Sequence, residues 1–428
     1  MQVADTPRAS RLDALLRQAG RSTLDGVVNI LRGPRARRHT LLAVCPNSEA
    51  VTHAALSAAQ QADMPLLFAA TLNQVDTDGG YTGWTQASFA SYVEATCERE
   101  GIDVPIFLCL DHGGPWKKDL HAMEDWPYEE TMAAVKDSIT ACLQAGYRLL
   151  HLDPTVDRRL PAGTPVPVET IVERTVELLQ HAEDVRAQAH LPPVAYEVGT
   201  EEAGGGLQGV ERFTAYVDAL EAALEAHHLP RPCFVVGDVG TTLASDHFNP
   251  AQAQTLAQAA ERLPALIKGH YTDDVANPEA YPISGMGGAN VGPGFSAVEY
   301  EALLDLVRLE ARLDHHSGFP EALRNAVIES NRWRKWLQPR EEGRAFEALA
   351  PERQEWLIRT GSRYVWTHPA VDAARQRLYA NVADHHPAAS YVRWRIETDI
   401  LHYAHHFNLI GLNEQLLADL TPASTVAS

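Results

Sequence analysis

The chain has 428 residues, of which 45% are hydrophobic and 21% charged, so it has enough apolar material for a large globular core. Its 36 Lys and Arg residues against 56 Asp and Glu residues give a net charge of −20, which argues against general nucleic-acid binding because that needs basic patches. No run of about 18 apolar residues occurs, so we expect no membrane span.

Residues 40–310 alternate short apolar runs with longer segments of helical spacing. Apolar runs of four to six residues are typical of strands buried on both faces of a parallel sheet. The segment TMAAVKDSITACLQAG at 131–146 places apolar residues three and four positions apart, as amphipathic helices do. The predicted strands are, in chain order, LLAV at 41–44, PLLFAA at 65–70, PIFLCL at 105–110, RLLHL at 148–152, PVAYEV at 193–198, CFVVG at 233–237, ALIKG at 265–269 and GMGGANVG at 285–292.

Eight strand–helix units over this length predict one (β/α)8 TIM barrel at residues 40–310. An open doubly wound sheet is the alternative, but it usually has fewer strands, and no GxGxxG motif follows the first run. Residues 1–39 form a predicted N-terminal helical segment. Residues 311–428 form a predicted helical C-terminal extension that is rich in aromatic residues, and we expect it to be a cap on the barrel or an oligomer surface.

Polar side chains follow most of the predicted strands, at the end where such a barrel carries its active site. Each has an ordinary structural explanation when taken alone, because a single His is more often a surface residue and a single Asp often caps a helix. They converge only if the strands close into a ring. They are Asn73, Gln74 and Asp76 after the second run, Asp111 and His112 after the third, Asp153 after the fourth, Glu201 after the fifth, Asp238, Asp246 and His247 after the sixth, His270, Asp273 and Asp274 after the seventh, and Asn290 near the eighth.

Imidazole and carboxylate groups gathered at one end of a barrel predict a divalent-metal site. Such ligands suit Zn²⁺, and also Mn²⁺, Co²⁺ or Ni²⁺. The glycine-rich pieces AGGG at 203–206 and GMGGANVGPG at 285–294 are able to cradle a phosphate through backbone N–H groups, and the second lies where barrels usually seat one. No Arg or Lys is evident in NVGPGFS at 290–296, which favours a free sugar over a phosphorylated one.

Eight pieces of the sequence carry a family resemblance. They are VCPNSEAVTHAAL, NQVDTDGGYTG, LDHGGPW, HLDPT, VGTEEAGGG, HYTDDVANP, NVGPGFS and RYVWTHPAVDAARQRL. Together they resemble the tagatose-bisphosphate aldolase subunit family usually called non-catalytic, which is related to the class II, metal-dependent aldolases with barrel folds. The similarity covers roughly residues 40–395, and NQVDTDGGYTG in combination with LDHGGPW is quite specific.

The resemblance implies roles for individual residues. Asp111 is similar to the class II aldolase aspartate that moves a proton at the reacting hydroxyl, and His112 to the adjacent metal-binding histidine. Glu201 is expected to bind the metal or to act as an acid and base, and His270 to bind the metal after strand seven. His247, in SDHFN, is loosely similar to the family's FDH segment and is expected near strand six. Substrate contacts are expected from Asn73, Gln74, Asp153, Asp273, Asn290 and Gly292, with Asn290 placed like the asparagine that orients the enediolate.

These roles predict a metal-dependent ketose or ketose-phosphate 4-epimerase of the fructose–tagatose type, which breaks and re-forms the C3–C4 bond. The alternative is a non-catalytic stabilising subunit of a class II tagatose-1,6-bisphosphate aldolase, whose partner would be the catalytic subunit. We expect a ketose or ketose phosphate as substrate, and a homo-oligomer. The five widely spaced cysteines include no CxxC pair, and the N-terminus has no apolar signal core, so we expect free thiols and a cytoplasmic protein.

Overall fold

Eight parallel strands close into a barrel in the computed structural model, which describes residues 8–17, 22–34, 38–161, 163–200, 207, 209–242 and 247–420. Neighbouring strands follow one another in the chain, and β8 pairs with β1 to close the ring. The predicted (β/α)8 barrel is confirmed, and every predicted apolar run contributes a strand. The strands are β1 Leu41–Val44, β2 Leu66–Thr71, β3 Ile106–Gly113, β4 Leu149–Leu152, β5 Ala195–Gly199, β6 Phe234–Val236, β7 Leu266–Gly269 and β8 Met286–Val291.

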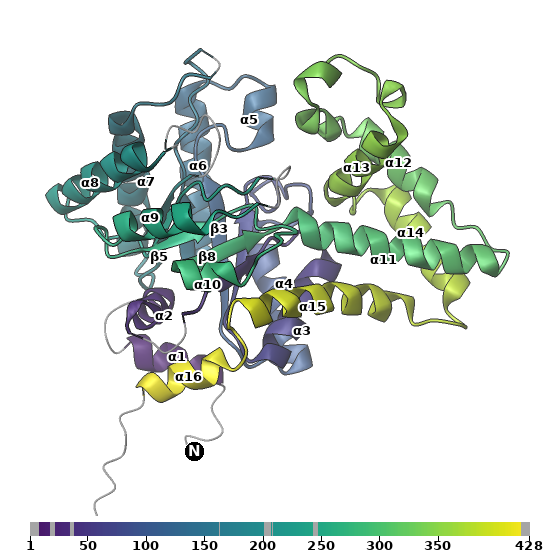
Figure 1. The fold of residues 1–428 in the computed structure, drawn as a ribbon, viewed down its shortest axis with the longest axis horizontal. Helices are drawn as coiled ribbons and strands as arrows, with labels where there is room; N and C mark the ends of the chain where they lie inside the picture. The colour runs from purple at the N-terminus through teal and green to yellow at the C-terminus, as the bar shows by residue number, and fades with distance from the viewer. Residues whose placement is uncertain are drawn as a thin grey trace, which may run out of the picture.

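Helices surround the strands, which are buried on both faces as their apolar composition predicts (Figure 1). Local signals set the helix ends: α3 begins after Ser48, whose side chain accepts the Val51 N–H, and ends at Asp63 in the left-handed conformation. The helices between and after the strands are α3 Glu49–Ala62, α4 Gln86–Glu100, α5 Asp119–Met123, α6 Tyr128–Gln144, α7 Val168–Gln188, α8 Val210–Ala226, α9 Pro250–Ala260, α10 Ala280–Ser284 and α11 Pro293–Arg312.

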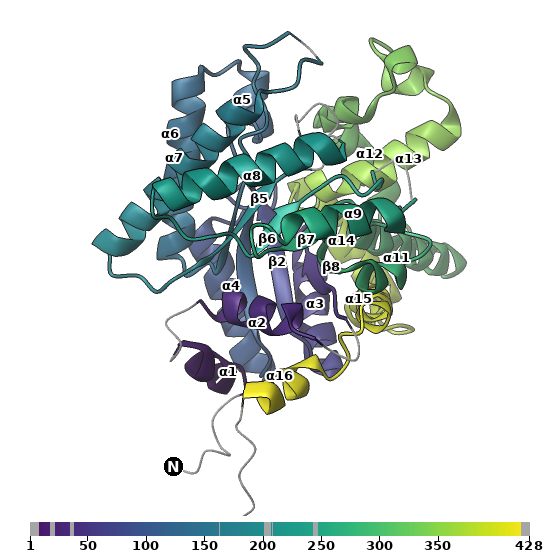
Figure 2. The same ribbon diagram turned by 60° about the vertical axis from the view of Figure 1, so that its left-hand side comes forward.

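Three helices from the two ends of the chain gather at one end of the barrel. They are α1 Arg8–Arg17, α2 Thr23–Arg32 and α16 Leu412–Leu420, and they pack on one another (Figure 1, Figure 2). Just before α16, Gly411 donates its N–H to the carbonyl of Ala62, at the end of α3 and shortly before β2 begins. These helices therefore cover the end at which the strands start, and the polar strand ends lie at the other.

The C-terminal extension folds back on the barrel. Its α15 packs along α3 and α11 (Figure 1). Tyr403 of α15 donates a hydrogen bond from its hydroxyl to the Thr272 carbonyl at 2.9 Å. Near the start of α11, the indole N–H of Trp366 donates to the Ser296 hydroxyl at 2.9 Å. The extension contributes α12 Phe319–Glu329, the 3₁₀ helix η2 Arg332–Trp336, α13 Pro351–Gly361, the 3₁₀ helix η5 Ser362–Tyr364, α14 Pro369–Val382 and α15 Ala388–His406.

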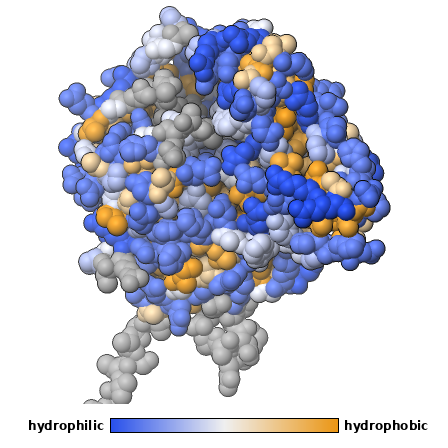
Figure 3. Space-filling model, turned by 45° about the vertical axis from the view of Figure 1, so that its right-hand side comes forward, coloured by the Kyte–Doolittle hydropathy of each residue, from blue (hydrophilic) through white to orange (hydrophobic). Residues whose placement is uncertain are grey.

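The surface agrees with the polar composition. The described side chains on the face drawn in Figure 3 are mostly hydrophilic, with small apolar patches between them. Among the described residues, no helix combines the length and the apolar character that crossing a membrane requires. All five cysteines are free thiols.

Candidate metal centre

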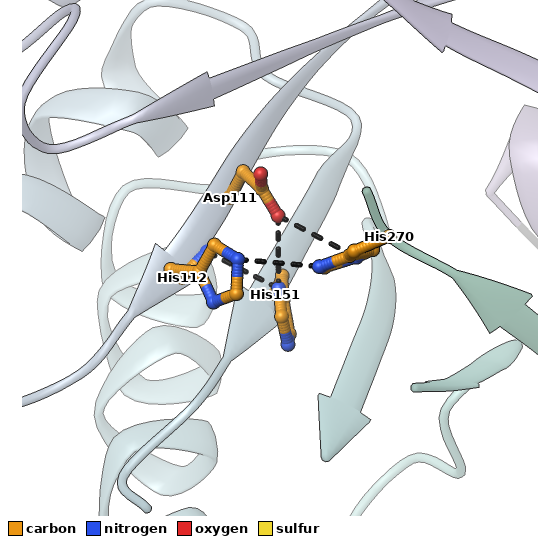
Figure 4. Close-up of side chains that lie close together, drawn as sticks. All are labelled: Asp111, His112, His151 and His270. Atoms are coloured by element: carbon orange, nitrogen blue, oxygen red, sulfur yellow. Dashed lines mark hydrogen bonds and ion pairs between the residues drawn. The ribbon is translucent and has the colours of Figure 1, made fainter. Parts of the chain in front are cut away.

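Four ionisable side chains meet at the C-terminal ends of the strands, and all of them except the fully buried His151 line one pocket. Asp111 and His112 come from β3, His151 from β4, and His270 directly follows β7. One nitrogen or carboxylate oxygen from each lies within 4.8 Å of the others, and Figure 4 shows the four side chains turned toward one another. Closure of the barrel brings these residues, far apart in sequence, to one point.

A backbone irregularity lets the adjacent Asp111 and His112 share this pocket. Consecutive side chains of a regular strand point to opposite faces of the sheet. The register between β3 and β4 shifts between Leu110 and Gly113, and His112 has a φ of 51°, in the left-handed region. Both side chains consequently line the pocket, although only one of them would do so in an unbroken strand.

Two carboxylates fix which nitrogens of His112 and His270 carry protons. Asp153 Oδ2 lies 2.7 Å from His112 Nδ1, and Glu197 Oε1 lies 3.1 Å from His270 Nε2. A carboxylate only accepts, so these nitrogens donate, and in the neutral rings the other nitrogens hold lone pairs. Those two nitrogens, His112 Nε2 and His270 Nδ1, face each other at 3.2 Å. Two lone pairs at this distance repel unless a proton or a cation lies between them.

His151 repeats this pattern. Its Nε2 donates to the Gly199 carbonyl at 2.9 Å, so the neutral ring has its lone pair on Nδ1. That nitrogen accepts the His112 backbone N–H at 3.1 Å but also lies 3.0 Å from Asp111 Oδ1. The lone pair on His151 Nδ1 and the negative Asp111 carboxylate would repel each other, so a positive charge between them would be stabilising here too. Three imidazoles and a carboxylate, with outer nitrogens held by carboxylates or carbonyls, fit a divalent transition-metal ion and its supporting shell.

The carboxylates of the centre are held ionised. Burial alone would raise the pKa of Asp111, but His112 and His270, with the hydrogen bond from His151, hold that pKa well below its usual range. Glu197 is fully buried, and burial would raise its pKa too. The ammonium of Lys268, 2.6 Å away, leads the groups that lower the pKa of Glu197 to about 2. Both carboxylates are therefore negative at neutral pH.

Asn290 completes the inner surface of the pocket. Its Nδ2 donates to Asp111 Oδ2 at 3.2 Å, which orients that carboxylate. Its Oδ1 is buried and has no hydrogen-bond partner among the described residues. A buried acceptor without a donor costs free energy, so a ligand hydroxyl at this position would be favoured.

Most of the residues expected from the sequence to contact substrate lie at the pocket. Asp153 is fully buried behind His112, where it also pairs with Lys117, and it does not line the pocket. His247 is exposed and belongs neither to the pocket lining nor to the four-residue cluster. Glu201 lies outside the described residues. The predicted substrate contacts that line the pocket are Asn73, Gln74, Asp273, Asn290 and Gly292.

Sequence reasoning missed His151, Glu197 and Lys268. All three lie inside predicted strands, within the runs RLLHL, PVAYEV and ALIKG, rather than after them. A polar side chain inside a fully apolar strand costs desolvation unless it meets a partner. That signal was available, and it marks residues that point into the barrel.

We expect Asp153→Asn to weaken divalent-metal binding about 10- to 100-fold, because the charged partner of a metal-binding histidine orients it and raises its basicity. Competition with a chromophoric chelator measures this affinity. Asp157→Asn is the matched control, since Asp157 pairs with Arg159 and Arg174 instead. Equal affinity in Asp153→Asn and the native chain would show that Asp153 does not support His112 as a ligand.

The chain is similar to one family model and to several solved structures. A family model described as "D-tagatose-1,6-bisphosphate aldolase subunit GatZ/KbaZ-like" matches residues 29–399. A solved structure titled as a probable tagatose 6 phosphate kinase from Sinorhizobium meliloti 1021 is similar at 25% identity and a TM-score of 0.68, covering 86% of this chain and 100% of that one. The YdjI aldolase from Escherichia coli K12 shows 11% identity and a TM-score of 0.37, covering 81% of this chain and 94% of that one. Fructose-bisphosphate aldolase from Campylobacter jejuni shows 12% identity and a TM-score of 0.45, covering 85% and 93%.

Proposed function

The chain belongs to the GatZ/KbaZ-like family of D-tagatose-1,6-bisphosphate aldolase subunits, and from this premise we propose that it is a metal-dependent ketose or ketose-phosphate 4-epimerase. The observation that carries the proposal is the facing pair of nitrogens on His112 and His270, each backed by an ionised carboxylate. A passive subunit would gain nothing from this arrangement, because every buried polar group in it costs desolvation.

His112 and His270 are the proposed metal ligands, and His151 lies close enough to be a third. A divalent ion bound there supplies Lewis acidity to the carbonyl and hydroxyl oxygens of the sugar. Glu197 accepts a hydrogen bond from His270, and its 2.6 Å ion pair with Lys268 keeps the Glu197 carboxylate ionised. Glu197 and Lys268 are positioning residues in this proposal.

Asp111 is the proposed proton acceptor. It is ionised, lines the pocket and is oriented by Asn290. It takes the proton of the C4 hydroxyl, the C3–C4 bond breaks, and the bonding electrons pass toward the C2 carbonyl, leaving a three-carbon enediolate and an aldehyde. The aldehyde turns its other face, C3 adds to it again, and Asp111 returns the proton. Direct removal of the C4 hydrogen is disfavoured because the C2 ketone does not activate it.

A second function comes from the family description, which names a subunit. In this alternative the chain stabilises a separate aldolase catalytic chain and has no chemistry of its own. The cluster of Asp111 and three histidines favours the enzyme, since a stabilising subunit has no need of it.

The test is to purify the chain alone, measure its bound metal, and follow interconversion of fructose and tagatose and of their phosphates. We expect a chelator to abolish the reaction and Zn²⁺, Mn²⁺, Co²⁺ or Ni²⁺ to restore it. The same chelator saturated with calcium is the control for non-specific effects. A metal-free, inert chain that raises the activity of an aldolase catalytic chain would establish the subunit function instead.

A further inference from the structure

We propose that Arg363 of the C-terminal extension, with Lys335 beside it, forms an anion-binding subsite in the pocket of the metal centre. The inference rests on the proposed function, and it narrows the substrate to a ketose that carries a terminal anionic group. The absence of Arg and Lys from the loop after strand eight led us to expect a free sugar. With this subsite, free sugars would instead be the poorer substrates.

The extension supplies part of the pocket wall. The 3₁₀ helices η2 and η5 place Lys335, Trp336, Arg363 and Tyr364 in the lining of the same pocket that contains Asp111 and His112. Tyr364 packs edge-to-face on Tyr81 of the barrel, with ring centroids 5.1 Å apart. The barrel and the extension therefore build one site together.

Arg363 is a buried cation without a paired anion. It is 5% exposed, and among the described residues no carboxylate oxygen lies within 4.0 Å of its guanidinium. The guanidinium donates to the Thr360 carbonyl and to the Tyr364 hydroxyl, and it lies over the rings of Trp336 at 5.2 Å and Tyr364 at 4.5 Å. Asp273 acts on it only as a more distant charge. Burial of an unpaired charge is costly, so a bound anion would relieve a penalty that the folded chain carries.

The other two cations that line the pocket already have carboxylate partners. Lys117 lies 2.6 Å from Asp153, and Lys335 lies 2.9 Å from Asp119. Lys335 is about half exposed, so it is able to turn toward a ligand while it stays close to Asp119. Among the lysine and arginine side chains of the described pocket lining, Arg363 is therefore the one without a carboxylate partner within 4.0 Å.

The usual anion seat of a barrel is filled by the protein itself. At the start of α11, the N–H groups of Gly292 and Gly294 donate to Asp273 Oδ1 at 2.9 and 2.7 Å. These backbone donors after the eighth strand are the ones that bind phosphate in many barrels. The Asp273 carboxylate already accepts from these N–H groups. An anionic group on the substrate must therefore bind other donors in the pocket, and the guanidinium of Arg363 supplies such donors.

A guanidinium recognises phosphate and carboxylate alike, since its planar donors match two oxygens of either group. The proposed ligand is therefore a ketohexose with a terminal phosphate or a terminal carboxylate. The extension would thus select the substrate, and the strand ends would carry out the chemistry.

Titration calorimetry on the full metal-loaded chain tests the subsite without relying on turnover. The probes are inorganic phosphate, a ketohexose phosphate, a ketohexuronate and a neutral ketohexose. We expect Arg363→Gln to weaken binding of the anionic ketose at least tenfold and to leave the neutral ketose unchanged. Arg363→Lys should restore part of the lost affinity, because it returns the charge. Arg334→Gln is the matched control, since Arg334 belongs to η2 but does not line the pocket.

The outcomes separate this inference from the proposed function. If binding of the anionic ketose depends on Arg363 while no ketose is epimerised, the subsite stands and the epimerase proposal fails. If the native chain epimerises ketoses but Arg363→Gln binds every probe as the native chain does, the subsite is overturned and the epimerase proposal stands. An equal loss for neutral and anionic ketoses, without rescue in Arg363→Lys, would show a structural role and also overturn it. The probe that loses the most affinity identifies phosphate or carboxylate as the recognised group.

Discussion

We expect His112→Ala to lose bound metal and epimerase activity together. The lone pair on His112 Nε2 faces the corresponding nitrogen of His270 at 3.2 Å, and truncation removes one of the two. Loss of an outer-shell partner alone costs about 10- to 100-fold in metal affinity, so loss of a ligand should cost more than about a hundredfold. Metal content after dialysis and the rate of ketose interconversion measure the two effects on the same preparation.

His270→Ala should behave in the same way, because its ring supplies the other half of the facing pair. His247→Ala is the control, since His247 is exposed and lies outside the pocket lining. It should retain both metal and activity. Full metal content in His112→Ala, or metal loss in His247→Ala, would contradict the ligand set that we propose.

We expect Asp111→Asn to keep the metal and to lower turnover about 10²- to 10⁴-fold, as the loss of a general acid and base does. The amide has nearly the shape of the carboxylate but cannot accept the C4 hydroxyl proton. Single-turnover rates measured at saturating metal isolate this step from changes in metal affinity.

The pH dependence gives a second measure of the same residue. The pKa of Asp111 is well below its usual range, so the carboxylate stays ionised at neutral pH. Its protonation should therefore reduce turnover only in strongly acidic solution.

Asp78→Asn is a suitable control for the Asp111→Asn substitution, because Asp78 is a half-exposed partner of Lys118. If Asp111→Asn instead loses metal in proportion to activity, Asp111 is a ligand and another group moves the proton.

The family and the geometry address different questions. Family membership places the chain among tagatose-bisphosphate aldolase subunits, but it does not say whether this chain carries out chemistry. The buried cluster of imidazoles and carboxylates bears on that question directly, because its facing lone pairs repel unless a proton or a cation lies between them. An aldol cleavage and its reversal on the other face of the aldehyde would use the same groups, which is why an epimerase is compatible with an aldolase-related family.

Local sequence patterns were sufficient for the barrel and for part of the site. Each strand is a short apolar run, and the intervening helices follow three- and four-residue spacing, so both depend on neighbours along the chain. The pair Asp111 and His112 was visible because it interrupts such a run at its end. Its position predicted the pocket once the strands were taken to be parallel.

Contacts between distant segments decided the rest. His151, Glu197 and Lys268 lie in apolar strand runs of the sequence. Only closure of the barrel brings His151 to Asp111, Glu197 to His270, and Lys268 to Glu197. Arg363 lies in a helical extension with no motif of its own, and it reaches the pocket only because the extension folds back over the strand ends. Spacing along the chain reports which face of an element is buried, whereas long-range packing determines which buried faces meet.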